Sequence, residues 1–296
     1  MDSPEAPRSD PIRVPSTGGA ELAAYDFGGA GPPILFAHAT GLHAHVWLPV
    51  IAHLRDEFRC FAFDERGHGH SAIPPGEPEE VFSWDRFAED ALAVVDRLGL
   101  VGDRQPFGVG HSCGGALSIR AEAERPGTYR ALWCFEPVVM AQEEAAAPNP
   151  ESGLAVGARR RREVFPSRQA AYDNYAAKLP FSAVDPAALA AYVEYGFEDL
   201  AASEGGGVRL RCRGTSEAWV FAMGGSHTTY QRARDVACPV TVARGDGFGS
   251  FSEAMLGPVV ARLPQGRAEP MPGLSHFGPM EDPARVAASI RAAFGS

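Results

Sequence analysis

The sequence lacks several features that would point to whole classes of function. It contains no apolar run of about eighteen residues, so we expect no membrane-spanning segment. It has no excess of basic residues either: the formal net charge is -10 at pH 7, which argues against a nucleic-acid partner. Residues 1–15 are polar and proline-rich without the apolar core of a secretory signal, so we expect a loose tail there.

Cysteine is also scarce and unpatterned. The five cysteines are odd in number and scattered, which favours free thiols in a reducing cytoplasm over disulfides. Two His-x-His pairs, His43 with His45 and His68 with His70, are the nearest approach to a metal motif. No cysteine or carboxylate cluster completes either pair, so we expect no metal and no cofactor.

What is present is typical of a large globular core, because 45% of the 296 residues are hydrophobic. Short continuous apolar runs alternate with segments of helical spacing. Such runs suit strands buried on both faces, and the alternation predicts a mostly parallel sheet covered by helices on both sides. The expected strands are 12–14, 20–27, 33–37, 60–64, 107–111, 131–135, 239–243 and 267–271, and the expected helices are 46–58, 84–98, 113–124, 255–263 and 283–294.

The pattern changes between residues 141 and 235. Alanines, charges and aromatic residues there recur at helical spacing, interrupted by prolines and by three consecutive glycines. We therefore expect an α/β core made of residues 1–140 and 236–296, with residues 141–235 inserted as a helical cap.

One short stretch carries the chemistry. Gly110-His111-Ser112-Cys113-Gly114 follows an expected strand and precedes an expected helix, as a nucleophile elbow requires. Small residues two positions before and after Ser112 allow a sharp turn that exposes its hydroxyl. The N–H of Cys113 would begin the helix, where unpaired amides stabilise negative charge.

Three further motifs strengthen this interpretation: 38–41 (HATG), 64–71 (DERGHGHS) and 273–279 (GLSHFGP). With the elbow they make the chain resemble the α/β-hydrolase superfamily over all but its first dozen residues, more weakly in the insertion. The resemblance implies an α/β-hydrolase fold with Ser112 as nucleophile and His276 as its base. It also implies an oxyanion hole formed by the N–H groups of Thr40 and Cys113.

The third member of the triad has two candidates. Relatives usually carry the acid in a G-x-x-D pattern after the strand that follows the insertion, but Phe248 stands three residues after Gly245. Asp246 lies close by in the same loop. Glu136 is the alternative, since it ends the strand 131–135 and some relatives, such as haloalkane dehalogenases, place their acid there. The sequence leaves both open.

Residues that contact substrate are expected near the loop after the first buried strand and in the insertion. The candidates are His38, His43, Trp219 and His227. His38 has the shaping of its loop as an alternative role, and the aromatic residues could simply pack the cap. Residues 159–162 are four consecutive arginines, which form either a solvated helix face or a clamp for an anionic substrate.

These features predict a serine hydrolase that cleaves a carboxylic ester, thioester or lactone of a small hydrophobic molecule through an acyl-enzyme. Serine at the elbow argues against epoxide opening and halide displacement, for which relatives use aspartate. C–C bond hydrolysis, cofactor-free perhydrolysis and a non-hydrolytic ligand-binding role remain alternatives. A homodimer is compatible with the sequence.

Overall fold

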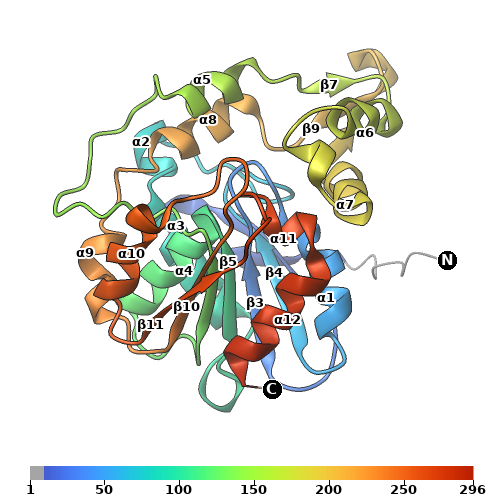
Figure 1. The fold of residues 1–296 in the computed structure, drawn as a ribbon. Helices are drawn as coiled ribbons and strands as arrows, with labels where there is room; N and C mark the ends of the chain where they lie inside the picture. Colours follow the sequence, from blue (N-terminus) through green and yellow to red (C-terminus); the bar gives the residue numbers. More distant parts are fainter. Residues whose placement is uncertain (1–9, 296) are drawn as a thin grey trace.

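The computed structural model describes residues 10–295, and its main feature is one eight-stranded sheet (Figure 1). The strand order is β1-β2-β4-β3-β5-β6-β10-β11. β2 is antiparallel to both neighbours and every other adjacent pair is parallel, so the predicted mostly parallel sheet is confirmed. The strands are β1 Ile12–Pro15, β2 Glu21–Asp26, β3 Pro33–Ala37, β4 Arg59–Asp64, β5 Phe107–His111, β6 Leu132–Phe135, β10 Val240–Arg244 and β11 Gly266–Pro270.

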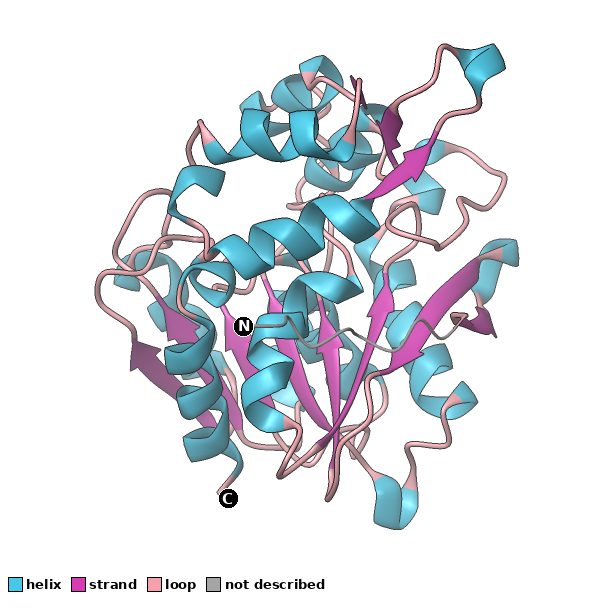
Figure 2. Ribbon diagram, turned by 90° about the vertical axis from the view of Figure 1, so that its right-hand side faces the viewer, coloured by secondary structure: helices cyan, strands magenta, loops and turns pink. Residues whose placement is uncertain are grey.

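Helices cover both faces of this sheet (Figure 2). One face packs against α1 (Leu48–Leu54) and α12 (Pro283–Phe294), and the other against α3 (Trp84–Arg97), α4 (Cys113–Glu124) and α10 (Glu253–Arg262). Two short helices, α2 (Pro78–Val81) and α11 (Gly278–Glu281), lie in the connections. No helix among residues 10–295 is both long and apolar enough to cross a membrane.

The apolar runs read from the sequence form strands because both of their faces are buried. In β3, Leu35 and Ala37 belong to the core cluster under α3 and α4, whereas Ile34 and Phe36 belong to the cluster under α1 and α12. A strand that alternates between two cores needs apolar residues at every position. The loops that follow the parallel strands consequently emerge together at one edge of the sheet.

The segment between β6 and β10 lies over that edge (Figure 1). It contains the helices expected there, and also a three-stranded antiparallel sheet in the order β7-β9-β8 that the sequence did not predict. The elements are α5 Gly153–Arg160, β7 Val164–Phe165, α6 Arg168–Ala176, α7 Pro186–Gly196, β8 Phe197–Asp199, β9 Val208–Leu210, α8 Gly214–Ala222 and α9 Thr229–Arg232. Its strands are two or three residues long, too short to show a period.

The start of the chain and the end of the insertion both contact the core. Of the expected tail, residues 1–9 lie outside the described part of the chain, and Ile12–Pro15 form β1 where the sequence predicts a strand at 12–14. At the end of the insertion, α9 packs on the core helix α4, and Arg232 Nη2 donates to the carbonyl of Ala123 at 3.2 Å. The last helix of the insertion, α9, therefore lies against the core.

Candidate active site

Ser112 occupies the turn between β5 and α4. Its backbone has φ 56° and ψ -114°, a conformation that non-glycine residues rarely adopt. Neighbouring glycines permit it: a Cβ at Gly110 would lie 2.5 Å from the carbonyl oxygen of Gly114, and one at Gly114 would lie 2.4 Å from that of Ala37. The small residues that the sequence suggested are thus required for steric reasons. The tight turn that they allow places the Ser112 side chain at the tip of β5.

The side chain of His276 reaches Ser112 from the loop after β11. Its Nε2 lies 3.1 Å from Ser112 Oγ, and its Nδ1 lies 2.6 Å from Glu136 Oε2. When Nδ1–H donates to the carboxylate, the lone pair on Nε2 is free to accept the serine hydroxyl proton. Three side chains from three loops at one sheet edge therefore form a continuous hydrogen-bonded chain, in the order Ser, acid, His along the sequence.

Glu136 is held in place for this contact. It is fully buried, directly follows β6 and has φ 44°. Its second carboxylate oxygen, Oε1, accepts the N–H of Gly245 at 2.9 Å, so both oxygens have hydrogen-bond donors. On the other side of the imidazole, His111 Nε2–H donates to the carbonyl of His276 at 2.7 Å. Glu136 is thus held by the loop after β10, and His276 by the end of β5.

The structure does not bring Asp246, the other acid suggested by the sequence, to His276. Its side chain is exposed, and Oδ1 accepts the N–H of Gly273 at 2.6 Å. Its own N–H donates to the carbonyl of Leu274 at 3.0 Å. Asp246 therefore braces the histidine loop from outside, and the position beside the imidazole belongs to Glu136.

The two amides expected to form an oxyanion hole lie on loops that are tied together. Cys113 is the first residue of α4, so its N–H has no acceptor within the helix. The next amide, Gly114 N–H, donates to the carbonyl of His38 at 3.0 Å and links the elbow to the loop after β3. The thiol of Cys113 also contacts the Thr40 hydroxyl, which places both residues side by side.

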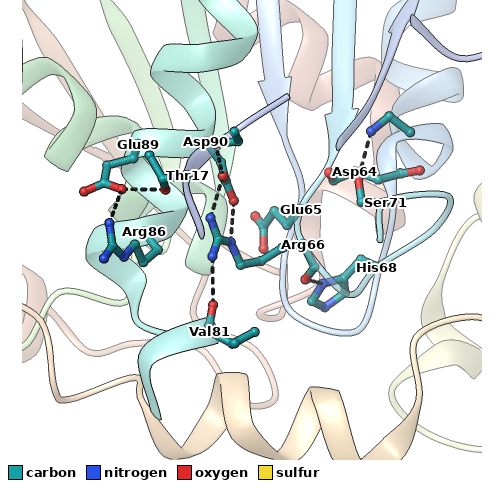
Figure 3. Close-up of polar contacts among 12 residues, drawn as sticks. Thr17, Asp64, Glu65, Arg66, His68, Ser71, Val81, Arg86, Glu89 and Asp90 are labelled. Carbon is teal, nitrogen blue, oxygen red and sulfur yellow. Dashed lines mark hydrogen bonds and ion pairs between the residues drawn. The ribbon is translucent and has the colours of Figure 1, made fainter. Parts of the chain in front are cut away.

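A second loop, 64–71, contacts the loop that carries Thr40 and Gly41, here called the oxyanion loop, and Figure 3 shows polar contacts that hold this second loop in place. His68 Nε2 accepts the N–H of Gly41 at 3.0 Å, and burial lowers the pKa of His68 to about 4, so the ring is a neutral acceptor. Arg66 anchors the loop through a two-point ion pair with Asp90, at 2.6 and 2.7 Å, in which both side chains are buried. The motif at residues 64–71 therefore holds neighbouring loops in place.

His38 was expected among the substrate contacts, and the structure gives it another place. It is fully buried, its Nδ1–H donates to the carbonyl of Ala39 at 2.8 Å, and its Nε2 accepts the N–H of Glu65 at 2.9 Å. Burial also lowers its pKa well below the usual value. With both nitrogens bonded to backbone groups, His38 shapes its loop, the alternative role noted from the sequence.

Glu65 is a residue of this region that sequence reasoning missed. Its carboxyl is fully buried behind the elbow, and neither oxygen has a hydrogen-bond partner among residues 10–295. Burial raises its pKa well above the usual value, with the nearby carboxylates of Asp90 and Asp64 adding to the effect. Burial therefore favours the protonated form of Glu65, whose carboxyl lies next to the Cys113 thiol.

The remaining substrate candidates lie under or within the insertion. His43 donates from Nε2 to the carbonyl of Tyr192 at 3.1 Å, and its Nδ1 has no partner in the described part of the chain. His227 stacks on Trp84 with ring centroids 4.8 Å apart, and its Nε2 likewise has no partner there. Trp219 is partly buried beside the same core cluster. Contact of these three side chains with substrate stays a prediction.

The arrangement can support acyl-transfer chemistry. No group of three or more His, Cys, Asp or Glu side chains within residues 10–295 is arranged to hold a metal ion. All five cysteines are buried and free of disulfides. What the site presents is a hydroxyl aligned on an imidazole that a buried carboxylate orients.

Comparison with known proteins bears on the family and the fold. Residues 34–289 match the model of the alpha/beta hydrolase family. A 2-(acetamidomethylene)succinate hydrolase from Mesorhizobium japonicum is 27% identical over 252 residues, which cover 84% of this chain and 83% of that protein. The crystal structure of an E-2-(acetamidomethylene)succinate hydrolase superposes with a TM-score of 0.78 at 23% identity, over 97% of this chain and 99% of that one. A thermophilic esterase from Thermogutta terrifontis, solved with malate bound, gives 0.70 at 20% identity, over 97% and 98%.

Proposed function

Because the chain belongs to the alpha/beta hydrolase family, we propose that it is a serine hydrolase that cleaves a carboxylic ester, thioester or lactone of a small molecule through an acyl-enzyme. One observation carries the proposal: Ser112 Oγ, His276 and Glu136 form a single chain with links of 3.1 and 2.6 Å. The names of relatives, a hydrolase of a succinate derivative and an esterase, are compatible with attack on a carbonyl carbon.

The reaction would begin with Ser112 Oγ attacking the substrate carbonyl while His276 Nε2 takes its proton. Glu136 keeps the imidazole in the correct tautomer and stabilises the imidazolium that forms. The negative charge that develops on the carbonyl oxygen faces the N–H groups of Thr40 and Cys113. Loss of one such donor typically costs about 2.7–4 kcal/mol of transition-state stabilisation.

Collapse of this intermediate breaks the bond to the leaving group, which receives the proton from His276. A water molecule then gives its proton to His276 and attacks the acyl-enzyme, and Ser112 recovers its proton as the acid product leaves. His276 takes a proton and passes it on once in each half of the reaction, first from Ser112 to the leaving group and then from water to Ser112, so the proton balance closes without a cofactor. Ser112 is 6% exposed and the His276 side chain 20% exposed, which limits competing water while leaving the reacting atoms reachable.

The test is labelling of Ser112 combined with ester turnover. The wild type should react with a fluorophosphonate and hydrolyse p-nitrophenyl acetate, and Ser112→Ala should do neither. Ser118→Ala is the matched control, because Ser118 lies on the same helix and donates to the carbonyl of Gly114 at 2.7 Å, away from the imidazole. If the wild type neither labels nor turns over ester, the proposal fails and a non-hydrolytic role for the fold takes its place.

A further inference from the structure

Within the basic run at residues 159–162, one arginine behaves differently from the others. Arg159, Arg160 and Arg162 are exposed, whereas the Arg161 side chain is only 17% exposed. It follows α5 and turns inward, and its Nη1 donates to Glu217 Oε2 at 2.5 Å. The sequence left two alternatives for this run, a solvated helix face or a clamp for an anion. In the structure the three exposed arginines face solvent, and Arg161 alone is turned away from it.

The inward guanidinium belongs to a cluster with an excess of hydrogen-bond donors. Arg161 Nη2 donates to the hydroxyls of Tyr192 at 2.7 Å and Tyr175 at 3.1 Å. A guanidinium has five N–H donors, of which these contacts and the one to Glu217 use three. Each phenol hydroxyl accepts from Arg161, and neither has an acceptor for its own proton among residues 10–295. Tyr192 is fully buried, so water does not readily supply that acceptor.

The cluster lies against the oxyanion loop on one side. A Cβ built on Gly41, the residue after Thr40, would lie 3.5 Å from Arg161 Nη1 and 2.3 Å from Glu217 Oε1. Gly41 has φ 79°, so a residue with a side chain would be strained there as well as obstructed. The guanidinium therefore packs directly on the loop that would hold the substrate carbonyl.

On its other side the cluster reaches the histidine loop. The ring of Tyr192 lies 4.8 Å from that of Phe181, and Phe181 lies 5.6 Å from Phe277, the residue after His276. Tyr175 also packs on Phe181, at 5.0 Å. The phenol groups of the cluster thus lie between the loop that holds Gly41 and the loop that holds His276.

We propose that Arg161, Tyr175 and Tyr192 bind a carboxylate carried by the acyl substrate, so that the natural substrate is an ester, thioester or lactone bearing a second, free acid group. A carboxylate offers about four lone-pair sites, which can accept the two phenol protons. Glu217 holds Nη1 and the two tyrosines take both Nη2 hydrogens, so the ligand meets the phenol O–H groups, with the guanidinium charge behind them. This inference rests on the proposed function of Ser112.

The test compares two substrates that differ only in the charge. Mono-4-nitrophenyl glutarate carries the free acid, and its methyl ester is the neutral counterpart; spontaneous hydrolysis is subtracted from both. The wild type should have a kcat/KM at least tenfold higher for the acid. Tyr192→Phe and Tyr175→Phe should each reduce that ratio by about tenfold, mainly through KM, since a hydrogen bond to a charged group is lost.

Tyr172→Phe is the control, because Tyr172 lies on the same helix as Tyr175 and is also partly buried, whereas the Arg161 hydrogen bonds to tyrosine go to Tyr175 and Tyr192. It should keep the wild-type ratio. A wild-type ratio near one, or a ratio that the two tyrosine variants leave unchanged, would overturn the carboxylate site while hydrolysis itself stands. Absence of turnover together with absence of fluorophosphonate labelling of Ser112 would instead overturn the proposed function.

A second measurement covers the case in which Ser112 labels but neither glutarate ester is turned over. Glutarate itself should slow the labelling of Ser112 in the wild type and in Tyr172→Phe. Protection should be weaker by about tenfold in Tyr192→Phe. Equal protection by glutarate and its dimethyl ester, or protection that is the same in all variants, would overturn the proposal.

Discussion

Replacement of Glu136 by glutamine is the sharpest perturbation of the triad, because it preserves the size of a fully buried side chain. In the wild type, one oxygen receives the N–H of Gly245 at 2.9 Å and the other faces His276 Nδ1 at 2.6 Å. Glutamine has only one carbonyl oxygen. If that oxygen serves Gly245, its NH₂ group faces Nδ1 and forces the imidazole proton onto Nε2, the wrong tautomer for accepting the Ser112 hydroxyl.

We therefore expect Glu136→Gln to lower kcat by about 10⁴-fold, equivalent to about 5 kcal/mol of transition-state stabilisation. The assay is steady-state hydrolysis of p-nitrophenyl acetate, with thermal unfolding to check that the variant folds. Asp246→Asn is the matched control: its exposed side chain does not touch His276, and an asparagine carbonyl can still accept from Gly273. An equal loss in both variants, or a loss below tenfold in Glu136→Gln, would refute this reasoning.

Three further changes test the scaffold around the site. Glu65→Gln should change how stability depends on pH. Between the unfolded pKa of Glu65, about 4.3, and its raised folded pKa, only the unfolded wild type releases the Glu65 proton. The free energy of unfolding of the variant, measured relative to the wild type, should therefore increase by about 1.4 kcal/mol for each pH unit in that range. Asp90→Ala should cost about 3–5 kcal/mol in urea unfolding, since it leaves Arg66 buried and unpaired. Gly41→Ala should lower kcat by about 10²–10³-fold through displacement of the oxyanion loop.

Each of these changes has an internal comparison. For Glu65→Gln, a difference in unfolding free energy that is the same at about pH 5 and about pH 8 would contradict a neutral buried acid. Asp96→Ala removes an exposed ion pair with Arg125 and should cost under about 1 kcal/mol; a cost like that of Asp90→Ala would contradict the argument from burial. Gly18→Ala also replaces a glycine of positive φ but has open space, so kcat should stay at the wild-type value.

The parts of the fold that the sequence predicts are those with a local physical cause. β3 and β4 are continuous apolar runs because both faces are buried, and α12 at Pro283–Phe294 matches the expected helix 283–294. Ser112 was recognisable because its turn demands glycines at fixed spacing. His276 was recognisable because the motif and its place after the last strand coincide.

The remaining parts depend on contacts between distant segments. Glu136 and Asp246 both follow buried strands, and only the three-dimensional course of the loops decides which carboxylate faces the imidazole. Glu136 adopts a positive φ that the neighbouring residues in the sequence do not predict. In the sequence Arg161 cannot be told apart from its three exposed neighbours. Only the fold places Glu217, from α8, beside it. Burial of a polar side chain is a tertiary property, and a local pattern does not reveal it.

The most direct measurement of the central claim is the intact mass of the protein quenched during turnover of p-nitrophenyl acetate, followed by peptide mapping. A covalent acyl-enzyme predicts the mass increase of one acetyl group, located on the peptide that contains Ser112 and accumulating before steady state. Ser112→Ala should show no such adduct. Full turnover by Ser112→Ala, or an acetyl group that forms only at another residue, would contradict the account.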